Sequence, residues 1–294
     1  MGKVYIIGTG PGDEELLTLK AVEALKKCDV VLYDRLVSNN ILNYLRPDCE
    51  IYYCGKEPGA HYQSQEEINN NLIKFAKKGK VVGRIKGGDP YVFGRGGEEV
   101  LALRDLDIDF EVISGVTSPV AVLNYAGIPI THRGMAQSFH IVTGMSAKES
   151  KVNFKALARE EGTLVFMMGL SNLGKIVREL VENGKDINTP TAVVMKGTTS
   201  KQKKVLGTLE NIEERVLRAK LKSPCIIVIG KVVTLNKELS WYENKPLFGT
   251  NICITRAKNQ SSNLKKKLTE MGADVLEINS IKTIFTITVG KLCP

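Results

Sequence analysis

A glycine-rich loop directly after an apolar strand is the feature that most constrains this chain. Residues 81–85 read VVGRI, which is typical of a buried strand, and residues 86–99 continue as KGGDPYVFGRGGEE. Glycines let the bare main chain approach a ligand closely. In an open α/β sheet, the loops at the carboxyl ends of the strands are where small molecules bind. We therefore expect a ligand site at this loop.

Short β-branched runs alternate with amphipathic segments, which is the pattern of an α/β fold. In the first half the expected strands are 4–7, 30–33, 50–53, 81–86 and 110–113, and the expected helices are 14–27 and 64–78. In the second half the expected strands are 139–143, 163–168, 191–196 and 225–230. Ser64 and Glu67 have the spacing of a capping box, and Gly79 suits the end of the same helix.

Four parts follow from this pattern: an N-terminal α/β domain at 1–115, a second α/β domain at 116–236, a linker at 237–246 and a βαβ-like tail at 247–294. A cleft between the two α/β domains is the natural place for a ligand. The tail offers only two strands and one helix, which cannot bury both faces of a sheet, so we interpret it as a truncated domain.

Composition excludes several classes of protein. The chain has 294 residues, 43% of them hydrophobic, with no secretory or membrane-spanning run, so we expect a soluble cytoplasmic protein. Six scattered cysteines and three histidines predict no zinc or other metal site and no disulfide framework. The net charge of +9 suits either nucleic acid or a polyanionic small molecule, although paired lysines at helix ends are usually just solvated.

A second glycine turn, GTGPGD at residues 8–13, follows the first strand and suggests a dinucleotide site. The last glycine of that motif is replaced by Asp13, and Glu14 and Glu15 come next. Carboxylates at a helix start satisfy its amides and disfavour a pyrophosphate. A phosphate-free cationic cofactor such as S-adenosylmethionine fits this turn better.

Several separated motifs, in order, carry a family resemblance over residues 3 to about 235. They are GTGPGD at 8–13, YDRLVS at 33–38, GK at 55–56, the loop at 86–99, AGIPITHR at 126–133, MGL at 168–170 and KGT at 196–198. The chain resembles the tetrapyrrole methylases, and within them the branch that methylates uroporphyrinogen III.

The resemblance implies a homodimer of two-domain chains that bind S-adenosylmethionine in the interdomain cleft. It further implies methylation of uroporphyrinogen III at C2 and C7 to give precorrin-2, the precursor of sirohaem or cobalamin. By the same motif match, the cofactor contacts are Pro11, Gly87, Gly88, Asp89, Val92, Thr117, Ser118, Met168 and Gly197.

The resemblance and simple chemistry together indicate the catalytic groups. A ring N–H must lose its proton as a pyrrole carbon attacks the methyl group, and Asp34 is the candidate base, its alternative role being a helix cap. Lys56 is a candidate proton donor or an anchor for a substrate carboxylate. Cationic candidates for the eight substrate carboxylates are Arg35, Arg95, His132 and Arg133. Arg95 could instead bind Glu98.

The tail from residue 247 resembles the beginning of uroporphyrinogen-III synthase, and too little of it is present for synthase activity. Competing functions remain open. One is a methylase of the same fold that acts on a later corrin precursor or on ribosomal RNA, although no arginine-rich segment or aromatic-basic platform is present. Others are a non-catalytic cofactor-binding protein and a nicotinamide oxidoreductase. We expect a small-molecule tetrapyrrole partner, with neither nucleic acid nor membrane.

Overall fold

The computed structural model describes residues 2–55, 63–145, 152–255 and 258–278. The chain forms two compact units, Met1–Ser240 and Trp241–Pro294. Within the described residues, no helix is both long and apolar enough to cross a membrane. The α/β fold class predicted from the sequence is confirmed.

The first unit begins with a five-stranded sheet of order β3-β2-β4-β1-β5, in which every pair is parallel. Its strands are β1 (Lys3–Gly8), β2 (Val30–Tyr33), β3 (Glu50–Tyr53), β4 (Val82–Lys86) and β5 (Asp109–Ile113). Because the strands are parallel, all their carboxyl ends lie at one edge. The glycine-rich loops after β1 and β4 therefore start next to each other.

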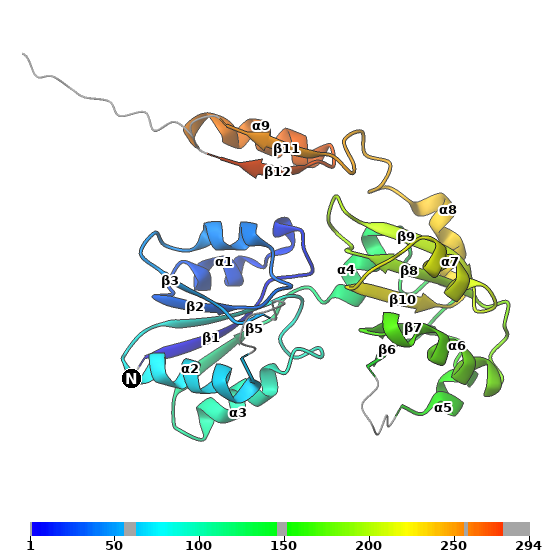
Figure 1. Cartoon of the computed structure of the whole chain (residues 1–294), viewed down its shortest axis with the longest axis horizontal. Helices are drawn as coiled ribbons and strands as arrows, with labels where there is room; N and C mark the ends of the chain where they lie inside the picture. Colours follow the sequence, from blue (N-terminus) through cyan, green and yellow to red (C-terminus); the bar gives the residue numbers. More distant parts are fainter. Residues whose placement is uncertain (1, 56–62, 146–151, 256–257, 279–294) are drawn as a thin grey trace, which may run out of the picture. The chain divides into compact units, whose positions relative to one another are not determined.

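Helices cover both faces of this sheet (Figure 1). One face carries α1 (Leu19–Leu25), which follows the short turn η1 (Glu14–Leu16), and η2 (Asn39–Tyr44). The other carries α2 (Gln65–Lys77) and α3 (Gly96–Arg104). The neighbouring strands β1 and β4 thus continue into helices on opposite faces, α1 and α3. This is the topological switch point at which an open α/β sheet forms its ligand crevice.

A second sheet in the same unit has the order β6-β7-β10-β8-β9 and is mixed. Its strands are β6 (Phe139–Thr143), β7 (Thr163–Met167), β8 (Pro190–Met195), β9 (Lys203–Thr208) and β10 (Cys225–Ile229). The helices of this part are α4 (Ser118–Tyr125), α5 (Phe154–Arg159), η3 (Leu170–Asn172), α6 (Leu173–Glu182), α7 (Ile212–Arg218), η4 (Lys231–Leu235) and α8 (Asn236–Leu239). One core lies under α4 and η4, and another lies under α5, α6 and α7.

The second unit is a small βαβ arrangement: β11 (Asn251–Ile254), α9 (Lys258–Glu270) and β12 (Asp274–Glu277). β11 and β12 pair in parallel. Ile254, Ala273 and Val275 form its buried core. The segment before β11 belongs to this unit, because the Leu247 amide donates to the carbonyl of Met271.

Two of the differences between the expected elements and the observed ones have a clear physical cause. The single helix expected at 14–27 is a 3₁₀ turn followed by α1, because the Thr18 hydroxyl accepts a hydrogen bond from the Ala21 amide and starts a new helix. β9 was not predicted, since its sequence KKVLGT is polar at one end and holds a glycine. The capping box predicted at Ser64 and Glu67 is present.

Candidate active site

The loops after β1 and β4 are joined through their main chains at the switch point. The Gly10 amide donates to the Gly88 carbonyl at 3.2 Å, and the Gly88 amide donates to the Gly10 carbonyl at 2.7 Å. Both glycines have a positive φ, +74° and +71°, a conformation that other residues rarely adopt. The Thr9 amide and hydroxyl both donate to the Lys86 carbonyl, which holds the start of the second loop.

The loop after β5 packs against the same two glycine-rich loops. A Cβ on Gly115 would lie 2.2 Å from the Gly88 carbonyl oxygen, and a Cβ on Gly8 would lie 2.5 Å from the Gly115 nitrogen. The Asp89 carboxylate accepts hydrogen bonds from the amides of Gly115 and Tyr91. The Asp89 side chain is therefore used to fix these loops, which leaves its main chain as the part available to a ligand.

The helix α4 begins beside this loop junction. A Cβ on Gly88 would come no closer than 3.9 Å to its nearest neighbour, the amide nitrogen of Ser118. Thr117 is the N-cap of α4, and its hydroxyl makes no capping hydrogen bond. The start of α4 at Thr117 and Ser118 thus lies beside Gly88, and the cofactor contacts predicted for these two residues remain predictions.

The loop after β1 is also tied to the second sheet. The Asp13 amide donates to the Thr198 hydroxyl at 3.2 Å, and the Tyr125 hydroxyl donates to the Asp13 carboxylate at 2.7 Å. Gly197 packs so closely that a Cβ there would lie 2.4 Å from the Val122 side chain. These contacts bring Pro11 and Gly197, which are 186 positions apart in the sequence, to one place.

A buried ionic cluster lies behind Asp34 and was not predicted. One nitrogen of the Arg84 guanidinium donates to both oxygens of Asp34 at 2.8 Å, and Nε donates to Glu99 at 2.9 Å. Lys86 donates to the same Glu99 oxygen at 2.9 Å. Arg84, Lys86 and Glu99 have side-chain exposures of 2%, 5% and 0%, whereas Asp34 has 31%. Asp34 is thus the member that solvent reaches.

Charge within the cluster follows from burial and pairing. Burial opposes the positive charge of Arg84, but Glu99 and Asp34 outweigh it, so the pKa of Arg84 is raised. Burial and the neighbouring Arg84 cation lower the pKa of Lys86, against the attraction of Glu99. A sequence signal existed: two cations alternate with apolar residues in the strand VGRIK, so both must face the same buried layer.

The other predicted residues lie farther from these contacts or are only partly described. Arg95, with φ +59°, forms a two-point ion pair with Glu98 at 2.9 and 2.7 Å, which is the alternative that the sequence left open. His132 Nδ1 lies 2.9 Å from the Arg133 carbonyl, and both side chains are exposed, as is Arg35. Lys56 lies outside the described residues.

Met168 and Val92 are two further residues predicted to contact the cofactor. Met168 follows β7 on the second sheet, with φ +55° and 43% exposure. Val92 is partly buried in the loop after β4, and its amide donates to the Asp89 carbonyl. Their predicted roles remain predictions.

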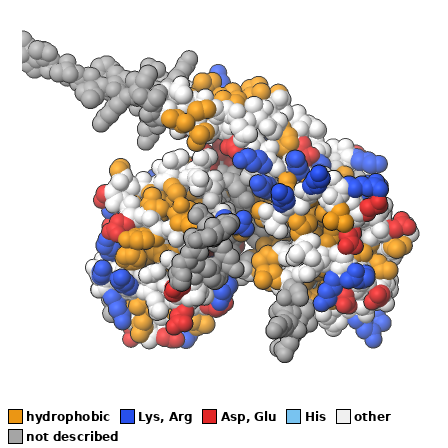
Figure 2. All heavy atoms as spheres, in the orientation of Figure 1, with side chains coloured by type: hydrophobic (Ala, Val, Ile, Leu, Met, Phe, Trp, Pro, Cys, Tyr) orange, Lys and Arg blue, Asp and Glu red, His pale blue; other side chains and the backbone are white. Residues whose placement is uncertain are grey.

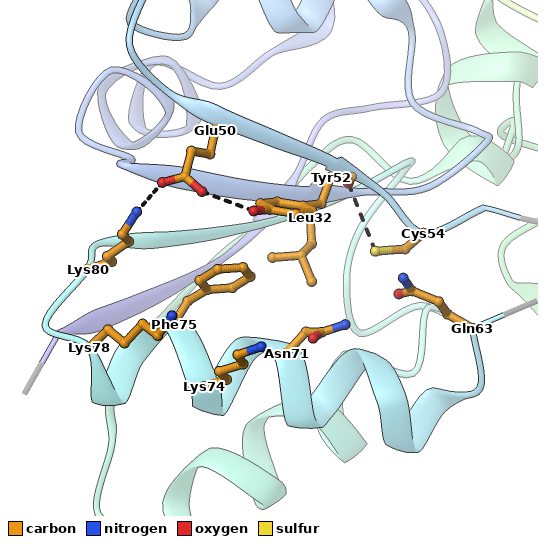
Figure 3. A pocket seen from close by; sticks show the side chains of 10 residues that line it. All are labelled: Leu32, Glu50, Tyr52, Cys54, Gln63, Asn71, Lys74, Phe75, Lys78 and Lys80. Atoms are coloured by element: carbon orange, nitrogen blue, oxygen red, sulfur yellow. Dashed lines mark hydrogen bonds and ion pairs between the residues drawn. The ribbon is translucent and has the colours of Figure 1, made fainter.

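A separate pocket of about 340 Å³ lies along the edge strand β3 and the helix α2 (Figure 3). Leu32 and Phe75 line its apolar side, and Lys74, Lys78 and Lys80 line its rim. Lys80 pairs with Glu50, which also accepts a hydrogen bond from Tyr52. None of its ten lining residues was predicted as a site residue.

Charge on the surface is mixed. On the face drawn in Figure 2, Lys and Arg side chains form several groups with Asp and Glu between them, rather than one continuous basic surface. That arrangement gives no support to the nucleic-acid alternative on this face, because a nucleic-acid site needs clustered positive charge.

The fold and the loop junction define a class: a two-sheet α/β protein whose glycine-rich loops meet at the switch point of its parallel sheet. Residues 3–213 match the family model of the Tetrapyrrole (Corrin/Porphyrin) Methylases. The chain belongs to this family.

Individual relatives support the same family assignment. A uroporphyrinogen-III C-methyltransferase of Bacillus subtilis (strain 168) is 49% identical over 247 residues, which are 83% of this chain and 96% of the relative. The crystal structure of uroporphyrin-III C-methyl transferase from Thermus thermophilus, complexed with S-adenosylhomocysteine, is 41% identical. It has a TM-score of 0.69 and covers 80% of this chain and all of that one.

A longer relative includes the tail. The porphyrin biosynthesis protein HemD of Ruminiclostridium josui is 44% identical over 285 residues, which are 96% of this chain. The chain spans only 56% of that relative's length.

Proposed function

We propose that this chain transfers methyl groups from S-adenosylmethionine to carbon atoms of uroporphyrinogen III. The observation that carries the proposal is the loop junction of Gly10, Gly88 and Gly115, within a chain 41% identical to a methyltransferase solved with S-adenosylhomocysteine. Two methyl groups are added, at C2 and C7, and the product, precorrin-2, supplies sirohaem or cobalamin synthesis. The enzyme works without a metal, as a homodimer in the cytoplasm.

The cofactor lies against the loop junction. The main chain of residues 87–89 and Pro11 contact it, Thr117 and Ser118 offer hydroxyls, and Val92, Met168 and Gly197 complete the site. S-adenosylmethionine supplies an electrophilic methyl group on a sulfonium and carries no phosphate. A site with Asp13, Glu14 and Glu15 on one rim suits a cation better than a dinucleotide.

Asp34 acts as the base. As a pyrrole carbon attacks the methyl group, a carbon–carbon bond forms, the sulfur–methyl bond breaks, and the ring N–H proton passes to a carboxylate. Arg84 occupies one lone-pair direction on each Asp34 oxygen, and the remaining ones can accept. Lys56 donates a proton or holds a substrate carboxylate, and Arg35, Arg95, His132 and Arg133 bind the other carboxylates.

The first test is anaerobic incubation with uroporphyrinogen III and methyl-labelled S-adenosylmethionine, followed by mass spectrometry. We expect two added methyl groups. Asp34→Asn should lower kcat on the order of 100-fold or more while S-adenosylhomocysteine still binds. Asp48→Asn is the matched control, since Asp48 is an exposed, arginine-paired carboxylate before β3.

Two outcomes would contradict this proposal. No transfer by the wild-type chain with S-adenosylhomocysteine bound would leave the cofactor site standing and direct the search to later corrin precursors. A wild-type kcat in Asp34→Asn would remove the base assignment alone.

The tail is the beginning of a uroporphyrinogen-III synthase domain. The support is the long relative, whose similarity extends through residues 241–278 and of whose length this chain spans 56%. A synthase makes the substrate of this methylase, so both activities in one chain would act on successive intermediates.

A further inference from the structure

We propose that Arg84 is a positioning residue that acts through Asp34, and that Glu99 and Lys86 hold Arg84 in place. The proposal rests on the proposed function, because it concerns how that reaction's base is aimed.

Strand register brings these residues together. Leu32 of β2 pairs with Arg84 of β4, so Asp34, two residues after Leu32, comes level with Lys86. Side chains alternate along a strand, and Val30, Leu32 and Val82 all belong to the core under α2 and α3. Asp34, Arg84 and Lys86 therefore project to that same layer, where α3 supplies Glu99.

Arg84 has a partner for each of its nitrogens. Nε donates to Glu99, one terminal nitrogen donates to the carbonyls of Leu32 and Ile85, and the other donates to both Asp34 oxygens. A guanidinium fixed on three sides and 2% exposed has no freedom to turn. The Asp34 carboxylate that it grips is accordingly held in one orientation.

Glu99 holds Arg84 from the buried side. Its Oε1 accepts from Arg84 Nε at 2.9 Å, from Lys86 Nζ at 2.9 Å and from the Gln65 side-chain Nε2 at 3.3 Å. Its Oε2 is buried, and no group among the described residues donates a hydrogen bond to it. Lys86 also lies 3.9 Å from Asp34, so the lysine spans the two carboxylates.

Stability alone does not account for this arrangement. The buried ions Arg84, Lys86 and Glu99 cost several kcal/mol each in lost hydration, and apolar side chains of similar volume often do as well or better. An orphan carboxylate oxygen adds to that cost. The cluster is also one-sided: three members are buried, and only Asp34 reaches solvent, beside the strand end that leads into Gly87. This points to orientation of Asp34 as the role of the cluster.

A double-mutant cycle tests the proposal. Arg84→Lys keeps the charge but removes the fork that grips Asp34. We expect kcat to fall on the order of 10- to 100-fold, as for a misplaced catalytic group. The KM for uroporphyrinogen III and the affinity for S-adenosylhomocysteine should stay at wild-type values. In an Asp34→Asn background, Arg84→Lys should cause no further loss.

Controls separate positioning from folding. Arg46→Lys should leave kcat unchanged, since Arg46 pairs with Asp29 and Asp48 around the amino ends of β2 and β3. Glu99→Gln retains size and shape and should lower kcat in the same direction, again only when Asp34 is present. If Arg84→Lys does not fold, the Glu99→Gln cycle decides the matter.

Several results would overturn the proposal. One is a folded Arg84→Lys enzyme with wild-type kcat; another is an equal loss in the Asp34→Asn background. Crystal structures of the wild type and of Arg84→Lys provide a readout that needs no activity. An Asp34 carboxylate in the same position in both would contradict positioning. If the wild type methylates nothing, the proposed function fails, yet the position of Asp34 still decides the role of Arg84.

Discussion

Lys86 gives a prediction at the scale of a single residue. Burial and Arg84 lower its pKa from 10.5, so between the lowered value and 10.5 the unfolded chain binds more protons than the folded one. Stability from this group is therefore fully present above 10.5 and is lost as pH falls through the lowered pKa. The stability of the wild type relative to Lys86→Met should rise as pH increases toward 10.5, measured by urea unfolding.

Lys3 provides the matched control for that experiment. Its pKa is raised, chiefly by its hydrogen bond to Glu111, so its contribution is present below the unfolded pKa and is lost as pH rises through the folded value. Lys3→Met should thus show the opposite trend, attenuated by solvent. A wild-type advantage over Lys86→Met that stays flat or falls with pH would refute the assignment for Lys86.

Part of the site could be predicted from residue types alone. The sequence predicted a glycine-rich ligand loop after the strand at 81–86 and a glycine turn after the first strand; the structure adds that Gly10 and Gly88 pair. It missed Arg84 and Glu99, although two cations inside an apolar strand already required a buried anion. Which carboxylate pairs with these cations depends on how α3 crosses β4, and this cannot be predicted from a local sequence pattern.

At the scale of elements, the junction of three strand ends predicts a strict need for glycine at position 115. A Cβ there would lie 2.2 Å from the Gly88 carbonyl oxygen and 2.6 Å from the Gly8 carbonyl carbon, both main-chain atoms that cannot swing away. Gly115→Ala should cost about 1 to 3 kcal/mol of stability and weaken S-adenosylhomocysteine binding, measured by thermal unfolding and calorimetry.

Gly97→Ala serves as the comparison, because a Cβ on Gly97 meets no atom within 4 Å and alanine suits a helix better than glycine. It should be neutral or stabilising. Equal stability of Gly115→Ala and Gly97→Ala would mean that the strand ends are less tightly packed than described here.

Elements with complete local signals were predicted well. The limits of β2 and β3 agree with the expected 30–33 and 50–53, and the capping box of α2 forms between Ser64 and Glu67. The prediction of one helix at 14–27 was wrong because Thr18 is an N-cap that starts a separate helix, α1. β9 was not predicted because it is an edge strand whose stability comes from pairing with β8, a tertiary effect.

At the scale of the whole molecule, the sequence predicted two α/β halves but not the order of their strands or the antiparallel pairing of β10. Those depend on long-range packing. The junction between Asp13, Tyr125 and Thr198 joins residues up to 185 positions apart, so only the folded chain reveals it. The family resemblance had already indicated that Pro11 and Gly197 serve one ligand, without giving the contacts.

The division at Ser240 leads to the last prediction. Contacts divide the chain there, and 80% of this chain covers the whole of the Thermus thermophilus methyltransferase. A chain ending at Ser240 should therefore fold, bind S-adenosylhomocysteine and methylate uroporphyrinogen III at the full-length rate. The tail alone, with Ile254, Ala273 and Val275 as its core, buries too little to be stable by itself. Truncation should therefore leave the main calorimetric unfolding transition unchanged. A large loss of activity on truncation would instead assign the tail a part in the methylase site.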